Sequence, residues 1–182
     1  LTMAALRKAS AYSKKRVVPY TRISKKKSKS YIKAVPAQKI VKFTMGNQSG
    51  FKDGKFPYKL TLVTDEDIQI RHNALEACRQ YVNKKLETTY PGQYLFKVMS
   101  FPHHIQREHR MLTGAGADRM SAGMQLSFGK AMGKAVILKK GKGIFFAAVN
   151  SPKAISLTRH WFKQIKSKLP CTTRILYEEV KE

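Results

Sequence analysis

Carboxylates are scarce in this chain of 182 residues, which holds 11 Asp and Glu against 36 Lys and Arg. The formal charge of +25 exceeds what solubility requires and indicates a polyanionic partner. The first 52 residues contain fourteen Lys and Arg, and the first carboxylate is Asp53. The basic runs at 14–16 and 25–29 repel themselves and bury little apolar surface. We therefore predict that residues 1–37 form an extended basic arm that RNA neutralises.

Cysteine and long apolar runs are also rare. The two cysteines, Cys78 and Cys171, lie far apart without CxxC spacing, so we predict neither a disulfide framework nor a zinc site. An intracellular, reducing compartment fits this usage. No run of about 20 apolar residues occurs, and the basic N-terminal segment has no clean apolar stripe. These absences argue against attachment to a membrane.

Motifs of catalysis are missing as well. A phosphate-binding P-loop needs four residues between its first Gly and a Gly-Lys-Ser/Thr, but only three separate Gly129 from Gly133, and Ala135 follows Lys134. The few acids lie away from Cys171 and from the histidine cluster at 103–109, so no nucleophile, base and acid come together. The histidine spacing matches no standard zinc pattern. We predict a protein that is not an enzyme and needs no cofactor or metal.

The elements that the sequence does predict are strands at 39–44, 58–63, 94–101, 135–138, 144–149 and 173–180. Apolar residues at helical spacing predict one helix from Ile70 to just before Pro91, with Thr64 and Asp67 as a capping box. A second helix is expected from a Ser151 cap to Leu169, and 46–50 reads as a loop. Together these elements predict an α+β two-layer sandwich, a mainly antiparallel sheet with two helices on one face. Residues 38–182 would form this single domain.

A long Gly-rich segment, 111–134, interrupts the predicted domain. Its glycines would let backbone amides approach phosphates, while Arg119, Lys130 and Lys134 supply charge, so we favour a loop inserted into RNA. The alternative is a mobile surface loop without a role. Just before it, His103 and His104 cluster with basic side chains and would contact phosphates or bases. The alternative is that they are ordinary surface histidines without a role in binding.

Three tyrosines of the arm, Tyr12, Tyr20 and Tyr31, are interleaved with cations. This spacing suits stacking on splayed bases between phosphate contacts. Tyrosine serves equally well to anchor the arm against its own domain, and the sequence leaves both readings open.

Several strings of residues, taken together, resemble one known family. They are RHNALEA at 71–77, PHH at 102–104, GAGADR at 114–119, GM at 123–124 and FGK at 128–130. On these residues the chain is similar to the large-subunit ribosomal protein ten-e family, the archaeal and eukaryotic counterpart of bacterial large-subunit protein sixteen. The amino-acid sequence of the N-terminal region resembles that of archaeal members. Gln125 and Ala131 stand where relatives usually carry Arg and Pro, which removes one phosphate contact expected in this loop.

The resemblance implies a structural constituent of the large ribosomal subunit in the cytoplasm. It implies binding to ribosomal RNA near the aminoacyl-tRNA side of the peptidyl transferase centre, contact with neighbouring ribosomal proteins, and a role in tRNA positioning and late assembly. The loop facing the tRNA acceptor ends would comprise Gly114, Ala115, Gly116, Ala117, Asp118 and Arg119. The residues expected to bind RNA are Arg7, Lys8, Lys14, Lys15, Arg16, Arg22, Lys25, Lys26, Lys27, His103, His104, Arg107, Arg110, Lys130 and Lys134.

Two other functions use the same composition. A free RNA chaperone or ribosome assembly factor would carry a similar basic arm but cycle on and off its target. An RNA-modifying enzyme would need a cofactor pocket and an acid or base cluster, and the sequence shows neither.

Overall fold

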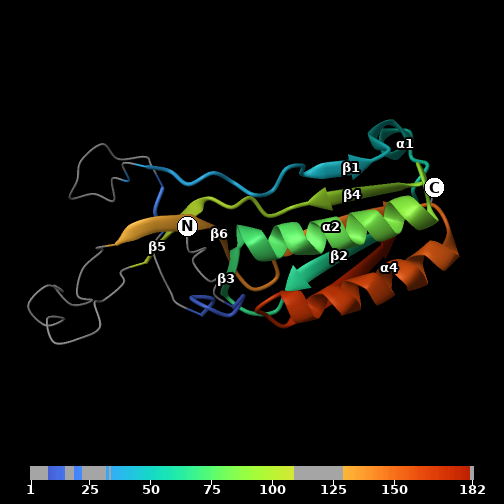
Figure 1. The fold of residues 1–182 in the computed structure, drawn as a ribbon. Coiled ribbons are helices and arrows are strands. Elements are labelled where there is room, and N and C mark those ends of the chain that lie inside the picture. Colours follow the sequence, from blue (N-terminus) through green and yellow to red (C-terminus); the bar gives the residue numbers. More distant parts are fainter. Residues whose placement is uncertain (1–7, 15–18, 22–31, 33, 109–128, 181–182) are drawn as a thin grey trace, which may run out of the picture.

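The computed structural model describes residues 8–14, 19–21, 32, 34–108 and 129–180, and all strand pairs among them are antiparallel (Figure 1). Within these residues the main sheet has five strands in the order β1-β4-β7-β2-β8, and a smaller sheet has three in the order β3-β6-β5. The strands of the main sheet are β1 (Thr44–Gly46), β4 (Tyr94–Val98), β7 (Gly143–Val149), β2 (Tyr58–Thr64) and β8 (Thr173–Glu179). Those of the smaller sheet are β3 (Ile68–Arg71), β6 (Lys130–Leu138) and β5 (His104–Glu108). The helices are α1 (Gln48–Lys52), α2 (His72–Thr89), α4 (Pro152–Ile165) and the 3-10 turn η1 (Lys166–Lys168).

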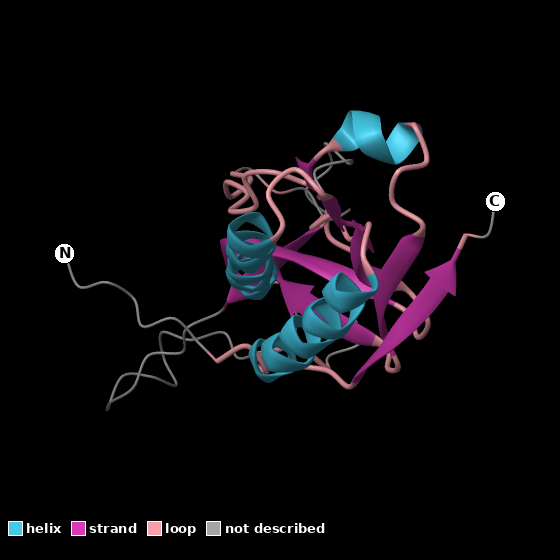
Figure 2. Ribbon diagram, turned by 90° about the vertical axis from the view of Figure 1, so that its right-hand side faces the viewer, coloured by secondary structure: helices cyan, strands magenta, loops and turns pink. Residues whose placement is uncertain are grey.

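The two long helices lie side by side on one face of the main sheet (Figures 1 and 2). Alternate residues of β2, β4 and β7, among them Leu60, Phe96 and Phe145, point to this face and are fully buried. They pack against the apolar stripes of α2 and α4, for which Val82 and Phe162 are examples. Each fully buried side chain of this size stabilises the fold by about 1.5–3 kcal/mol relative to an exposed one. The predicted α+β architecture, with two helices on one face of an antiparallel sheet, is confirmed.

The start of α2 differs from the prediction. Ile70 belongs to β3, because residues 68–71 pair with β6, and the helix begins only at His72. Its N-cap is Arg71, whose side chain makes no capping hydrogen bond. The predicted capping box is therefore wrong, and the helix is held by its tertiary packing rather than by a polar cap.

The residues expected to cap α2 instead form the turn between β2 and β3. The Thr64 hydroxyl donates to the carbonyl of Glu66 at 2.8 Å and accepts from its amide at 3.2 Å. The carboxylate of Asp67 accepts from the backbone amide of Lys140, in the turn that joins β6 to β7, at 2.8 Å. The side chains of Thr64 and Asp67 thus stabilise turns of the sheets and do not cap a helix.

The second helix begins as predicted. Ser151 is its N-cap and its hydroxyl accepts from the amide of Ala154, while Pro152 occupies the first turn. The α-helix stops at Ile165, before the predicted end at Leu169, because η1 takes over the last turn. Residues 48–52, which overlap the stretch 46–50 expected as a loop, form α1, where the side chain of Asn47 accepts from the amide of Gly50 at 2.9 Å.

The smaller sheet is the largest departure from the prediction. β5 was not predicted at all, and β6 begins at Lys130, so the last five residues of the predicted loop 111–134 belong to a strand. Polar residues line the interior of this sheet, since Gln69 and Gln106 are both buried and the amide of Gln106 donates to the side-chain oxygen of Gln69. A strand whose buried positions are polar reads as surface in the sequence.

Candidate RNA-binding site

The smaller sheet forms one end of the molecule, opposite the end that carries α1 (Figure 1). β5 ends at Glu108 and β6 begins at Lys130, so these two strands flank the Gly-rich segment. They pair antiparallel, with Glu108 opposite Lys130 and Ile105 opposite Lys134, and the register shifts between Gln106 and Arg107. The predicted site residues Arg107, Lys130 and Lys134 are therefore brought together on adjacent strands.

His104 is placed inside the protein. Its side chain is 4% exposed, and its Nδ1 accepts a hydrogen bond from the backbone amide of Tyr20 at 3.0 Å. Burial, together with the nearby His103 and Arg107, lowers the pKa of His104 to about 4, so the ring is neutral at physiological pH. The ring holds the arm in place and has no positive charge to offer a phosphate.

His103, by contrast, is partly exposed. One ring nitrogen lies 3.1 Å from the carbonyl oxygen of Phe101, which leaves the other nitrogen of the ring outside this contact. Of the two adjacent histidines, His103 is the one whose position suits a contact with a base or a phosphate. Its role there stays a prediction.

Tyr20 anchors the arm on β5. Its carbonyl accepts from the amide of Ile105 at 2.9 Å, while its own amide donates to His104. The guanidinium carbon of Arg107 lies 3.7 Å from the centre of the Tyr20 ring, a close cation–π contact. Of the two roles considered for Tyr20, stacking on bases or anchoring the arm on its own domain, the structure shows the anchoring role.

A second segment of the arm lies against β3. The carbonyl of Ser13 accepts from the amide of Gln69 at 2.9 Å, and Ser13 is buried. Ala9 packs against the main core, whereas Lys8 and Lys14 on either side are exposed. The described parts of the arm are thus docked on the small sheet while their lysines face outward.

The pKa of His72 is lowered to about 4, chiefly by burial. Positive charge from three cations in separate parts of the chain, Lys39, Arg71 and Lys134, lowers it further. The imidazole Nε2 also lies close to Gly133, where an added Cβ would stand 3.1 Å away. Lys39 and Arg71 were not among the predicted site residues, because no local pattern shows that the fold brings them beside Lys134.

The acids near this end are engaged within the protein. Asp65 pairs with Arg174 at 3.6 Å. The carboxylate of Glu66 accepts a hydrogen bond from the backbone amide of Thr172 at 3.1 Å, and hydrogen bonding by Thr172 lowers the pKa of Glu66. Lys130 and Lys134, and the hairpin-tip lysines Lys139, Lys140 and Lys142, form no side-chain ion pair within the described part of the chain. Their charge is available to a polyanion.

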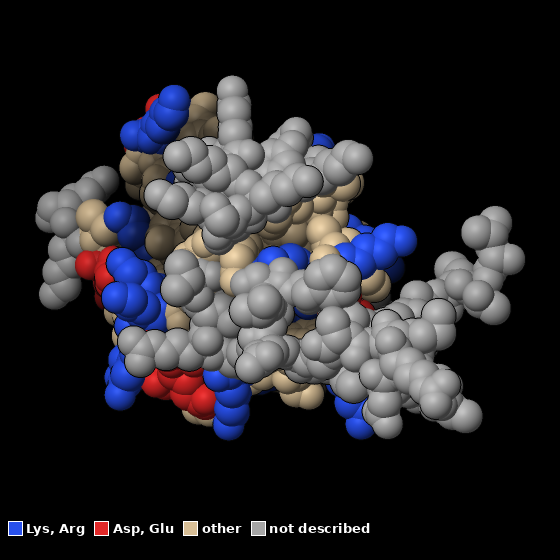
Figure 3. Space-filling model, turned by 90° about the vertical axis from the view of Figure 1, so that its left-hand side faces the viewer, with Lys and Arg blue, Asp and Glu red and all other residues tan. Residues whose placement is uncertain are grey.

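Figure 3 shows this end of the molecule, with blue Lys and Arg atoms on several sides and red acidic atoms confined to a few groups. The other predicted contacts lie outside the described residues: Arg7, Lys15, Arg16, Arg22, Lys25, Lys26, Lys27, Arg110 and the loop residues 114–119. Tyr31 lies outside them too. Contacts at all of these positions remain predictions.

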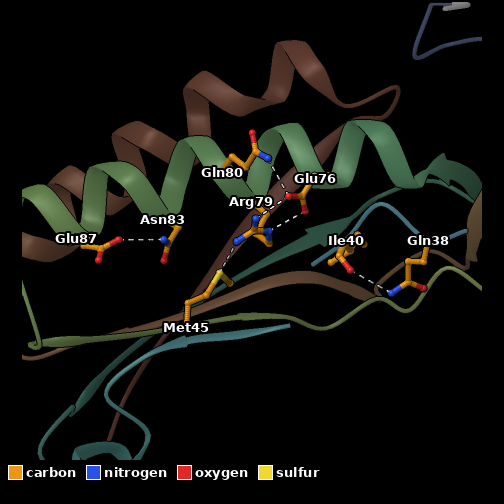
Figure 4. A network of polar contacts seen from close by, with 8 residues as sticks. All are labelled: Gln38, Ile40, Met45, Glu76, Arg79, Gln80, Asn83 and Glu87. Carbon is orange, nitrogen blue, oxygen red and sulfur yellow. Dashed lines mark hydrogen bonds and ion pairs between the residues drawn. The ribbon is translucent and has the colours of Figure 1, made fainter. Parts of the chain in front are cut away.

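A buried ion pair within α2, between Glu76 and Arg79, also holds β1 and the residues before it against the helix (Figure 4). Arg79 donates to both carboxylate oxygens of Glu76, at 2.6 and 2.7 Å, and to the sulfur of Met45 at 3.0 Å. Burial acts to raise the pKa of Glu76, but hydrogen bonds from Arg79, Gln80 and the backbone of Val41 lower it below its ordinary value. The carboxylate therefore holds the chain where it leaves the arm and enters the sheet.

The described residues contain no group of three His, Cys, Asp or Glu side chains that could hold a metal ion. Burial raises the pKa of Cys78 to about 12 and also raises that of Cys171, so neither thiol is an activated nucleophile. No helix of the described part is both long and apolar enough to cross a membrane.

Comparison with known proteins matches the amino-acid sequence to a known family. The family model described as ribosomal protein L16p/L10e matches residues 18–176. The large ribosomal subunit protein uL16 of Methanococcus maripaludis strain C5 is 42% identical over 180 residues, covering 98% of this chain and 97% of the relative. The uL16 of Nanoarchaeum equitans is 41% identical over 184 residues, covering 98% and 96%, and that of Methanoculleus marisnigri is 41% identical over 151 residues, covering 82% and 86%.

Proposed function

The chain belongs to the ribosomal protein L16p/L10e family, and on that premise we propose that it binds ribosomal RNA beside the aminoacyl-tRNA side of the peptidyl transferase centre. As a member of this family it is a structural protein of the large ribosomal subunit and not an enzyme. It acts in the ribosome, in the cytoplasm, and ribosomal RNA and other ribosomal proteins are its partners. The place on the RNA, and the roles in tRNA positioning and late assembly, are our proposal.

One observation carries the proposal: the arm is anchored on the same strand that leads into the Gly-rich loop. Tyr20 bonds to the backbone of β5 through Ile105, and β5 ends at Glu108, directly before residue 109. The two segments richest in predicted RNA contacts therefore start from one end of the domain. A single RNA site at that end would engage both of them.

Electrostatics gives the mechanism of binding. Each phosphate that a lysine or arginine neutralises releases condensed counterions, so affinity for RNA falls steeply as salt rises. Lys8, Lys14, Lys130 and Lys134 stand on the docked arm and on β6, around the folded end. The charged arm adds to this set, and the chain would thus join RNA segments that otherwise repel each other.

Positioning of tRNA is assigned to the loop. Glu108 and Lys130, which flank residues 109–128 in the chain, are paired on adjacent strands. We assign to Gly114–Arg119 the approach to the acceptor ends, with Arg119 as the phosphate contact, because glycine backbones can come close to a sugar-phosphate chain. This would order the acceptor end without any chemical step by the protein.

Shortening the loop tests this assignment. Large subunits that carry the protein with 114–122 replaced by a shorter Gly-Ser linker should contain it in normal amount, because the anchors on β3 and β5 are unchanged. They should bind the acceptor end of aminoacyl-tRNA more weakly and transfer peptide to puromycin more slowly. Normal binding and normal transfer would show that the loop has no part in positioning tRNA.

A further inference from the structure

The main sheet has a second face that the two long helices leave uncovered. α1 packs against part of this face through an edge-to-face contact of Phe51 with Phe146 at 5.8 Å, and Phe56 packs on Leu95 and Ala148 beside it. The strand register places one row of residues across this face from edge to edge. In order, the row is Thr44, Lys97, Phe146, Thr61 and Leu176.

A hollow of about 440 Å³ lies on this face beside α1. Leu95, Met99, Phe51 and Phe146 provide its apolar surface, and Lys52 and Lys97 are the cations that line it. Its size falls in the range of pockets that hold small organic groups such as a nucleobase. Met99 is 51% exposed, which is unusual for a large apolar side chain next to a core.

A second hollow, of about 790 Å³, shares Phe51 and Lys52 with the first and adds Lys55 and Lys59. No acidic residue lines either hollow. The combined lining of the two hollows carries apolar and aromatic side chains and four lysines, and we call it the open-face track.

The charges around the open-face track favour an anionic occupant. Lys52, Lys59 and Lys97 form no ion pair within the described part of the chain, and Lys59 lies 5.8 Å from the centre of the Phe51 ring. Asp53 pairs with Lys55 at 3.8 Å. Glu178 stands opposite Lys59 on β8 and marks the end of the basic region toward that edge.

We propose that the open-face track binds an unpaired stretch of RNA, with one base against Phe146 and the flanking phosphates on Lys97 and Lys52. Stacking of bases on aromatic rings, combined with lysines along the strand, is the general way in which proteins hold single-stranded nucleic acid. The proposal rests on the proposed RNA-binding function and adds a second contact. This contact lies on the main sheet, away from the smaller sheet that carries the arm and the loop.

The test uses the full chain with its methionine methyl groups labelled for NMR and a single-stranded RNA of about five nucleotides that carries 2-aminopurine at its centre. The Met99 methyl signal should shift on addition of RNA, while that of Met45, on the helix-covered face, should not. The 2-aminopurine fluorescence should be quenched as the base stacks.

Substitutions locate the effect. Phe146→Leu keeps an apolar side chain and removes the ring, so binding should weaken about tenfold and the quenching should be lost. Lys97→Gln, an exposed change that spares the core, should weaken binding about threefold and flatten its salt dependence. Lys84→Gln, an exposed charge change on α2 across the sheet, is the matched control and should leave the Met99 shift and the quenching unchanged.

The outcomes separate this proposal from the proposed function. If large-subunit RNA binds in a salt-dependent way while the Met99 shift, the quenching and both variants show no effect, the open-face track is not an RNA site and the function stands. A Met99 response to an acidic, phenylalanine-containing peptide but not to RNA would also overturn the proposal, in favour of a protein partner. Failure of the full chain to bind any RNA would overturn both.

Discussion

Arg79 and Glu76 form a two-pronged ion pair inside the protein, with N–O distances of 2.6 and 2.7 Å. Both residues are less than 10% exposed, and Arg79 also reaches the sulfur of Met45 on β1. The pair joins the long helix α2 to the chain that leads out of the arm. The pair matters for stability because it is buried, and either charge without its partner would have no water there to solvate it.

Removal of one partner should therefore be costly. Glu76→Ala leaves the Arg79 guanidinium buried without its carboxylate, and we expect the free energy of unfolding to fall by about 3–5 kcal/mol. Urea denaturation measures this. Glu87→Ala, an exposed change on the same helix, is the control and should stay within about 0.5 kcal/mol. A loss from Glu76→Ala as small as that of the control would show that the pair does not stabilise the fold.

Acid should destabilise the protein through two buried histidines. The pKa of His72 and of His104 falls from 6.5 to about 4 on folding, chiefly because of burial. Between pH 6.5 and about 4 these two imidazoles are protonated in the unfolded chain but neutral in the folded chain. The free energy of unfolding therefore falls as the pH drops through this range. Each ring should contribute a loss of about 1.4 kcal/mol per pH unit in that window.

His104→Gln isolates one of these rings, since the glutamine oxygen can still accept from the Tyr20 amide. Urea denaturation gives the free energy of unfolding at about pH 7 and pH 5. The loss of this free energy between the two pH values should be smaller in the variant than in the parent by about 2 kcal/mol. The stabilising effect of the lowered Glu76 pKa is lost only at lower pH, below the ordinary value of 4.5. An equal pH dependence in variant and parent would mean that His104 titrates normally in the fold.

The anchor of the arm should weaken when its ring is removed. Tyr20→Leu deletes the cation–π contact with Arg107, and a contact of this kind contributes about 0.5–2 kcal/mol. We expect the Ile105 amide, which bonds to the Tyr20 carbonyl, to exchange its hydrogen about 2- to 30-fold faster. The Met99 amide, bonded to Ile144 in the main sheet, should keep its rate. Unchanged exchange at Ile105 would place the strength of the anchor elsewhere.

The lysine run of the arm should set the salt dependence of RNA binding. Replacement of Lys25, Lys26 and Lys27 by Ala should flatten the slope of log affinity against log salt by up to about 3. The melting temperature should hardly change. The same number of replacements at the exposed Lys84, Lys85 and Lys153 on the helices is the control. A slope equal to that of the parent would show that the run does not touch RNA.

The main layer of this fold is predictable from the sequence because its signals are local. Two short apolar runs on either side of the basic tip at 139–143 predict the hairpin of β6 and β7, and Ser151 with Pro152 predicts the start of α4. Both signals depend on neighbours within a few residues. Tertiary packing confirms these elements and shifts only their ends.

The smaller sheet escaped prediction for a physical reason. Several of its buried positions hold polar residues, Gln69, His104 and Gln106, which hydrogen-bond to one another or to the arm. These hydrogen bonds join residues far apart in the chain, so no local sequence pattern predicts them. The same holds for the site, where Lys39, Arg71 and Lys134 meet around His72 only in the folded protein.

Rebinding of the chain to large subunits that lack it tests the central claim most directly. Sucrose gradients after a moderate salt wash should show one copy of the full chain in each subunit, with backbone protection of one RNA region, and the Lys25, Lys26 and Lys27 variant should dissociate at lower salt. If the full chain stays at the top of the gradient, or binds equally well with all three lysines replaced and protects no RNA, the proposed RNA-binding role is contradicted.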